Sequence, residues 1–139
     1  MPRKHREKSE IGYYHVMMRG NNKEKVFLDN KLKARFLNVF KNERNDIELT
    51  AFCILDNHVH LVVSAQSGLG NLSDTMKIIN TKYAMHYNYF YEHCGHVFQG
   101  RFRSEAIQSV DDIKKVIRYV HLNPINAGIA RQIGSYYWS

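Results

Sequence analysis

The order of its strand-like and helix-like segments is the feature that most limits how this chain can fold. Short runs rich in apolar and aromatic residues predict strands over 13–19, 47–55 and 58–65. In three longer segments the apolar residues recur every three or four positions, which predicts amphipathic helices over 30–44, 71–91 and 110–122. Residues 95–109 predict a loop that leads into a fourth strand.

This β-α-β-β-α-β order, followed by one more helix, favours an α+β ferredoxin-like sandwich. In such a fold, helices cover one face of an antiparallel sheet, and here an additional C-terminal helix would carry Tyr119. Asn71 or Ser73 is predicted to cap the second helix. Pro124 is predicted to stop the last helix soon after residue 122, because proline has no backbone N–H to donate.

Positive charge is in surplus along the chain. Of its 139 residues, 20 are Lys or Arg and 13 are Asp or Glu, which gives a net charge of +7. Such a surplus favours polyanions such as nucleic acids, although many small basic proteins bind none. Residues 1–10 predict a basic, polar arm that an acidic partner would order, and residues 11–139 fit a single domain.

Cysteine content and hydropathy restrict the class of protein. Cys53 and Cys94 lie in unrelated contexts and predict neither a disulfide framework nor a zinc site. No apolar run approaches the roughly 20 residues that a membrane helix needs, and the first ten residues do not resemble a secretory signal. We therefore expect a soluble, cytoplasmic protein without a membrane partner.

Two histidines, His58 and His60, lie two positions apart in the third predicted strand. Side chains alternate between the faces of a strand, so these imidazoles share one face while Val59 and Leu61 point to the core. Neutral imidazole is a ligand for divalent transition metals, and Mg²⁺ or Mn²⁺ can share such a site when oxygen ligands join it. The alternative is a pair of hydrogen-bonded histidines on a solvated sheet face.

The last predicted helix brings a phenol and a carboxamide together. Tyr119 and Asn123 are four residues apart, so they lie on one flank of the helix. That flank borders the apolar stripe of the helix, formed by Ile113, Val116, Ile117 and Val120. The alternative is that Tyr119 packs at the core edge and Asn123 caps the helix ahead of Pro124.

Four segments, in their order along the chain, resemble the single-tyrosine HUH transposases. This family includes the transposases of small insertion sequences and the REP-associated tyrosine transposases. The segments are YHVMMRGNNKEKVF, FCILDNHVHLVV, GHVFQGRF and VIRYVHLNPINAG, and the resemblance covers roughly residues 11–130. It implies that His58 and His60 bind Mg²⁺ or Mn²⁺, that Tyr119 is the nucleophile, and that Asn123 supplies a third ligand. Several insertion-sequence relatives have glutamine at that last position, so Asn123, whose side chain is shorter, departs from their pattern.

The resemblance also implies a reaction. Single-stranded or hairpin DNA would be nicked to leave a 5′-phosphotyrosine and a free 3′-hydroxyl, and then rejoined without a nucleotide cofactor. Insertion-sequence relatives are dimers that can pair the tyrosine of one subunit with the histidines of the other, whereas REP-associated relatives are typically monomers. The short chain favours the first type, so a homodimer is expected, and we expect it to associate with the nucleoid. The alternative is a catalytically silent nucleic-acid-binding protein of the same fold. A plain zinc protein is disfavoured, since no cysteine or third histidine lies at useful spacing.

Several further residues are candidates for supporting roles. Cations and a turn amide are the candidate DNA contacts: Arg19, Asn21, Arg101, Arg103, Lys115 and Arg118. The alternative for each is a solvated surface group, which is expected for at least half of them. Phe102 is predicted to be core rather than a stacking platform for an unpaired base. Tyr83 is the next candidate nucleophile if Tyr119 is dispensable, and His15 is a candidate group behind the metal ligands.

Overall fold

A four-stranded antiparallel sheet forms the centre of the computed structural model, which describes residues 5–132 and 135–139. Its strand order is β2-β3-β1-β4, which confirms the predicted ferredoxin-like sandwich. The strands are β1 (Tyr13–Arg19), β2 (Glu48–Ile54), β3 (His58–Ser64) and β4 (Arg103–Ile107). The helices are α1 (Asn30–Glu43), α2 (Leu69–Phe90) and α3 (Val110–Asn126), with a 3₁₀ turn η1 at Asn21–Lys23.

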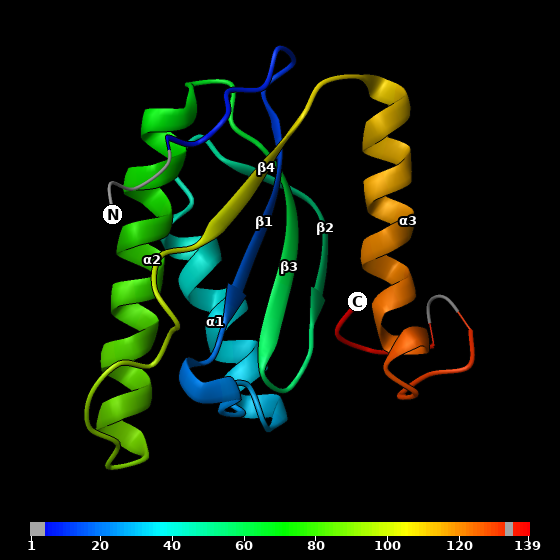
Figure 1. Ribbon diagram of the computed structural model, residues 1–139. Helices are drawn as coiled ribbons and strands as arrows, with labels where there is room; N and C mark the ends of the chain where they lie inside the picture. The colour runs from blue at the N-terminus through cyan, green and yellow to red at the C-terminus, as the bar shows by residue number, and fades with distance from the viewer. Residues whose placement is uncertain (1–4, 133–134) are drawn as a thin grey trace.

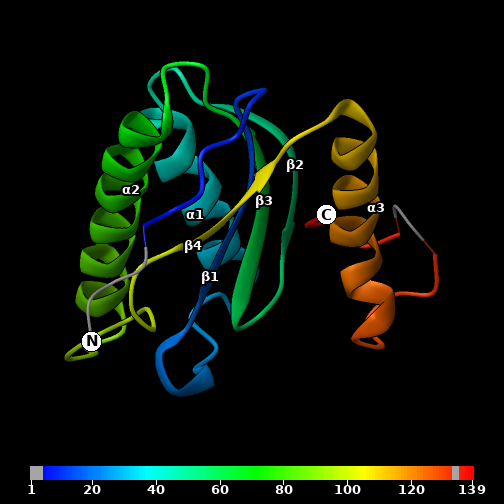
Figure 2. The same ribbon diagram turned by 45° about the horizontal axis from the view of Figure 1, so that its top comes forward.

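The three helices are divided between the two faces of the sheet. Helices α1 and α2 cover one face, and α3 lies alone on the opposite side, as both views show (Figure 1, Figure 2). Alternate residues of β3 separate these faces, since Val59, Leu61 and Val63 are buried in the larger apolar cluster with α1 and α2. The other set, which includes His58 and His60, therefore faces α3, as the period-two pattern predicted.

Helix α2 begins earlier than predicted. Its N-cap is Gly68, at φ 103°, and no side chain caps the helix, so the prediction that Asn71 or Ser73 does so was wrong. Glycine fits this position because the backbone enters the helix with a positive φ that other residues rarely adopt. Helix α1, by contrast, has a side-chain cap, because the Asp29 carboxylate accepts a hydrogen bond from Leu32 N at 2.8 Å.

Helix α3 runs through Pro124 to Asn126, so the prediction that proline stops it was wrong. Proline cannot donate to the carbonyl of Val120, four residues earlier. That carbonyl instead accepts a hydrogen bond from the Asn123 side chain, whose Nδ2 lies 3.4 Å from it. A neighbouring carboxamide thus supplies the Val120 carbonyl with the donor that proline lacks.

The described part of the N-terminal arm packs along β4. Arg6 lies over the ring of Phe102, 3.9 Å from its centroid, and donates a hydrogen bond to Phe102 O at 2.9 Å. Ser9 is buried, and its hydroxyl donates to Ile107 O. Phe102 is itself buried, as predicted, while residues 1–4 of the arm lie outside the described residues.

Of the helices in the described ranges, none combines the length and the hydropathy needed to cross a membrane.

Candidate active site

Three histidines meet on the face of the sheet that α3 covers. The rings of His58 and His60 on β3 lie with their centroids 5.0 Å apart. His15, on the neighbouring strand β1, joins them, with its Nε2 3.0 Å from Nδ1 of His60. The antiparallel register explains this proximity, since Met17 pairs with His60 and His15 lies two residues along the same strand face.

Tyr119 of α3 completes the cluster from the other side. Its ring centroid lies 5.9 Å from that of His15 and 5.9 Å from that of His60, in edge-on contacts. The side chain is half-exposed, at 51%, whereas His60 is 2% exposed. A phenol open to solvent therefore lies directly beside a shielded imidazole of its own chain.

Each of the two histidines on β3 has a hydrogen-bonding partner at Nδ1. Asn57 Oδ1 lies 2.6 Å from Nδ1 of His58 and can only accept, so Nδ1 carries the proton and Nε2 keeps its lone pair. Nδ1 of His60 lies 3.0 Å from Nε2 of His15, so Nε2 is the nitrogen of His60 outside that contact, and the tautomer decides whether it carries a lone pair. A partner on the far nitrogen is the usual way in which proteins orient metal-binding histidines.

The surroundings keep these histidines uncharged. Burial, and then the charges of His15, His58 and Arg19, lower the pKa of His60 to about 3. Burial and Arg19 lower the pKa of His58 as well. For His15, burial lowers the pKa against an opposing effect of the Glu105 carboxylate. Neutral imidazole is the form that binds metal, so the site is in its ligand form across the neutral range.

The predicted third ligand, Asn123, is turned toward its own helix. Its Nδ2 donates to Tyr119 O at 3.2 Å and to Val120 O at 3.4 Å. Within residues 5–132 and 135–139, no group of three or more His, Cys, Asp or Glu side chains is arranged to hold a metal ion. His58 and His60 could therefore supply two nitrogen ligands through Nε2, and a divalent cation held there would need oxygen atoms for its remaining ligands, for which Asn123 Oδ1 is a candidate.

Half of the predicted DNA contacts come together. Arg19, Arg101 and Arg103 line one small cavity of about 140 Å³ between the end of β1 and the start of β4. Arg19 also pairs with His58 in the register of β1 and β3, so this cavity adjoins the histidines. Guanidinium groups gathered in this way suit phosphate oxygens.

The other predicted contacts lie apart from this cavity. Lys115 and Arg118 are exposed on α3, where Lys115 is 4.0 Å from the carboxylate of Asp112. Asn21 belongs to the 3₁₀ turn, and its backbone N–H donates to Val97 O at 2.8 Å.

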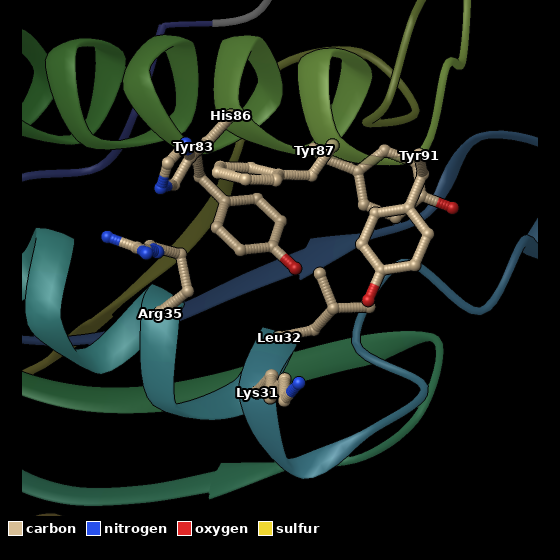
Figure 3. A pocket seen from close by; sticks show the side chains of 8 residues that line it. Lys31, Leu32, Arg35, Tyr83, His86, Tyr87 and Tyr91 are labelled. Carbon is tan, nitrogen blue, oxygen red and sulfur yellow. The ribbon is translucent and has the colours of Figure 1, made fainter.

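Tyr83, the rival nucleophile, is unsuited to the role. It is fully buried on α2, on the face of the sheet away from the histidines, and its hydroxyl donates to Val26 O. Burial raises its pKa far above the ordinary value for tyrosine. Figure 3 shows its ring beside Tyr87 and Arg35 in a cavity of about 400 Å³ between α1 and α2. Among the tyrosines of the described ranges, Tyr119 is the one with ring contacts to His15 and His60, and it is half-exposed.

Glu105 belongs to this cluster, although nothing in the sequence indicated it. Glu105 on β4 pairs directly with His15 on β1, and its carboxylate lies 3.7 Å from His15 Nδ1. The segment RSEAI was predicted only as part of a strand, and a single acidic residue in it carries no signal by itself. The pairing of β4 with β1 is what brings Glu105 to the site, and it follows from the fold rather than from a local pattern.

Comparisons with known proteins identify the family of the chain. The family model described as "Transposase IS200 like" matches residues 8–123. A REP-associated tyrosine transposase of Escherichia coli (strain K12) is 24% identical over 94 residues, which are 66% of this chain and 53% of that protein. The chain thus spans about half the length of this curated relative.

Two solved structures share the fold. The structure of a REP-associated tyrosine transposase bound to a REP hairpin superposes with a TM-score of 0.76 at 18% identity, covering 99% of this chain and 81% of the other. A protein of Deinococcus radiodurans described as a transposase gives a TM-score of 0.57 at 18% identity, over 86% of this chain and 94% of that one. At such identities the likeness concerns the fold.

Proposed function

Because the chain belongs to the IS200-like transposase family, we propose that it nicks and rejoins single-stranded DNA through a phosphotyrosine on Tyr119. The observation that carries this proposal is the meeting of Tyr119 with His60 and His15, at 5.9 Å between ring centroids, within one chain. Cleavage of a strand by tyrosine needs an accessible phenol beside neutral imidazoles that can bind a metal ion.

The reaction we propose exchanges one ester bond for another. The phenol oxygen of Tyr119 attacks the scissile phosphorus, a bond from phosphorus to Tyr119 forms, and the bond to the 3′-oxygen breaks. The phenol gives up its proton, and the leaving 3′-oxygen takes one up to become a free hydroxyl. Attack by a different 3′-hydroxyl reverses these changes and joins two strands, so no nucleotide cofactor is needed.

His58 and His60 would hold a divalent cation, Mg²⁺ or Mn²⁺, through their Nε2 atoms. When bound, such an ion polarises a phosphate oxygen and lowers the barrier to attack at phosphorus. The chain's own contribution is to keep both imidazoles neutral by burial, with Asn57 and His15 occupying their other nitrogens. Asn123 stays a candidate oxygen ligand, because its hydrogen bonds to the helix backbone are donated by Nδ2 and a metal ion would use Oδ1.

Hairpin-bearing DNA is the substrate that we propose. The similar solved transposase is bound to a REP hairpin, and the arginine-lined cavity next to His58 provides cations for phosphates in this chain. Arg19, Arg101 and Arg103 would neutralise the backbone, and binding would therefore weaken with salt. A homodimer is still a prediction, and the geometry does not require one, because the tyrosine and the histidines of one chain already meet.

The test is formation of a covalent protein–DNA adduct. The protein is incubated with a panel of labelled hairpin-bearing single strands and Mg²⁺ or Mn²⁺, and the products are resolved on denaturing gels. We expect an adduct that EDTA abolishes and that Tyr119→Phe reduces at least about 100-fold, since a phenyl ring has no nucleophile. Tyr89→Phe, at an exposed tyrosine of α2, is the matched control and should leave the adduct unchanged.

Retained adduct in Tyr119→Phe would contradict the assignment of the nucleophile. The alternative function is a catalytically silent DNA-binding protein of the same fold. That alternative predicts salt-dependent DNA binding by the unaltered protein with no adduct on any strand or with either metal.

A further inference from the structure

Glu105, His15 and His60 lie in a row across three strands of the sheet. The Glu105 carboxylate is 3.7 Å from Nδ1 of His15, and Nε2 of His15 is 3.0 Å from Nδ1 of His60. We infer that Glu105 and His15 act as positioning residues that fix the proton of His60 on Nδ1, so that Nε2 presents its lone pair to a metal ion. This inference rests on the proposed function, in which His60 is a metal ligand.

The contact between the two histidines has the geometry of an in-plane hydrogen bond. Their rings are within 22° of parallel, with centroids 5.2 Å apart, so the ring edges rather than the faces meet. His15 is 6% and His60 2% exposed, so water has little access to exchange partners with either ring. One shared proton therefore determines the state of both rings.

Only one placement of that proton leaves Nε2 of His60 able to bind a metal ion. If Nδ1 of His60 donates to Nε2 of His15, then Nε2 of His60 keeps its lone pair. If Nε2 of His15 donates instead, then His60 must carry its proton on Nε2, where it blocks coordination. The two placements also differ at His15, because the first puts N–H on Nδ1 and the second puts a lone pair there.

Glu105 selects the first placement. An N–H on Nδ1 of His15 faces the carboxylate favourably, whereas a lone pair there faces a negative charge. At 3.7 Å the contact is an electrostatic one rather than a hydrogen bond, and Glu105 is largely exposed, so solvent weakens it without changing its sign. Asn57 favours the same tautomer of His58, because its Oδ1 can only accept from Nδ1 of that ring. Both proposed ligands would then keep the lone pair on Nε2.

The tautomer is measurable by NMR without metal or DNA. Two-bond ¹H–¹⁵N correlation spectra of the ¹⁵N-labelled, EDTA-treated protein at neutral pH distinguish a protonated Nδ1 from a protonated Nε2. We expect His60 to be protonated mainly on Nδ1, and Glu105→Gln to increase the Nε2-protonated fraction at least about threefold. Glu48→Gln, which removes an exposed carboxylate on the more distant strand β2, is the matched control and should change nothing.

Metal affinity provides the second readout. By titration calorimetry with Mn²⁺, His15→Phe should weaken binding by about 10- to 100-fold, the range seen when a partner of a ligating histidine is lost. His15→Gln should recover part of that loss, because its amide oxygen can accept from Nδ1 of His60. Thermal melts confirm that each variant is folded, and Glu105→Gln on the surface remains informative if His15→Phe unfolds.

Protonation of His60 on Nε2 in the unaltered protein, or an unchanged tautomer in Glu105→Gln, would overturn the inference. Unchanged Mn²⁺ affinity in a folded His15→Phe variant would do the same. Failure to form a DNA adduct with the expected tautomer present would instead count against the proposed function, because the spectra need neither cleavage nor metal.

Discussion

His60 is a polar side chain that the fold holds almost entirely out of water. Its imidazole lies beneath α3 and beside His15 and His58, and burial and these neighbours lower its pKa to about 3. A folded protein that refuses a proton which its unfolded chain accepts loses stability in acid. The same burial that prepares His60 for a metal therefore makes the metal-free domain sensitive to mild acid.

The sign and size of this effect can be predicted. The unfolded chain binds a proton on His60 below pH 6.5, whereas the folded chain does so only near pH 3, so stability falls as the pH decreases between these values. From pH 7 to pH 5, His60 alone should lower the free energy of unfolding by about 2 kcal/mol. His15 and His58, whose pKa values are also lowered, act in the same direction.

Urea unfolding curves in EDTA at both pH values would measure this loss. The variant His60→Gln, which cannot be protonated, should lose clearly less stability between the two pH values than the unaltered protein. An equal loss in both proteins would show that the acid sensitivity arises elsewhere.

Local sequence periodicity predicted part of the residue-scale arrangement. The two-residue period placed His58 and His60 on one face, and helical spacing placed Tyr119 on the flank of its apolar stripe. The sequence indicated His15 only as a candidate to contact the metal ligands, and it did not indicate Glu105 at all. Both residues reach the site through the pairing of β1 with another strand. Register is a long-range property, and neither YYHVMMR nor RSEAI specifies its partner.

At the scale of elements, the boundaries of the helices were predicted less well than their existence. Apolar spacing located all three helices, but the ends depend on individual hydrogen bonds. Pro124 illustrates this, since its missing N–H would ordinarily end α3 and the Asn123 carboxamide compensates for it. Helix α3 also carries Tyr119, the nucleophile that we propose, five residues before this proline.

A double-mutant cycle tests the compensation. Asn123→Ala should lower the free energy of unfolding by about 1 kcal/mol, because the Val120 carbonyl loses its donor. In a Pro124→Ala background, the backbone N–H of residue 124 can donate to that carbonyl, and Asn123→Ala should then cost much less. Equal costs in both backgrounds, measured by urea unfolding, would show that the two residues act independently.

At the scale of the molecule, we predict that a single chain completes the proposed active site. Tyr119 and His60 of the same chain lie with ring centroids 5.9 Å apart. A mixture of Tyr119→Phe and His60→Ala proteins therefore contains no chain with both groups. We expect such a mixture to form no more DNA adduct than either variant alone, even at concentrations where a dimer forms.

The assay is the same denaturing gel, with unaltered protein diluted into each variant as the control for subunit exchange. Adduct restored by mixing the two variants would show that a tyrosine from one subunit acts with the histidines of another.

The sheet separates what keeps this protein folded from what we propose makes it reactive. Most of its buried apolar residues lie between the sheet and helices α1 and α2, and the histidines and Tyr119 lie on the other side. Under the proposed function, replacing a few side chains on that second side is expected to abolish strand cutting while the larger apolar core keeps the domain folded. A lineage that lost the proposed chemistry in this way would still inherit a folded, basic domain.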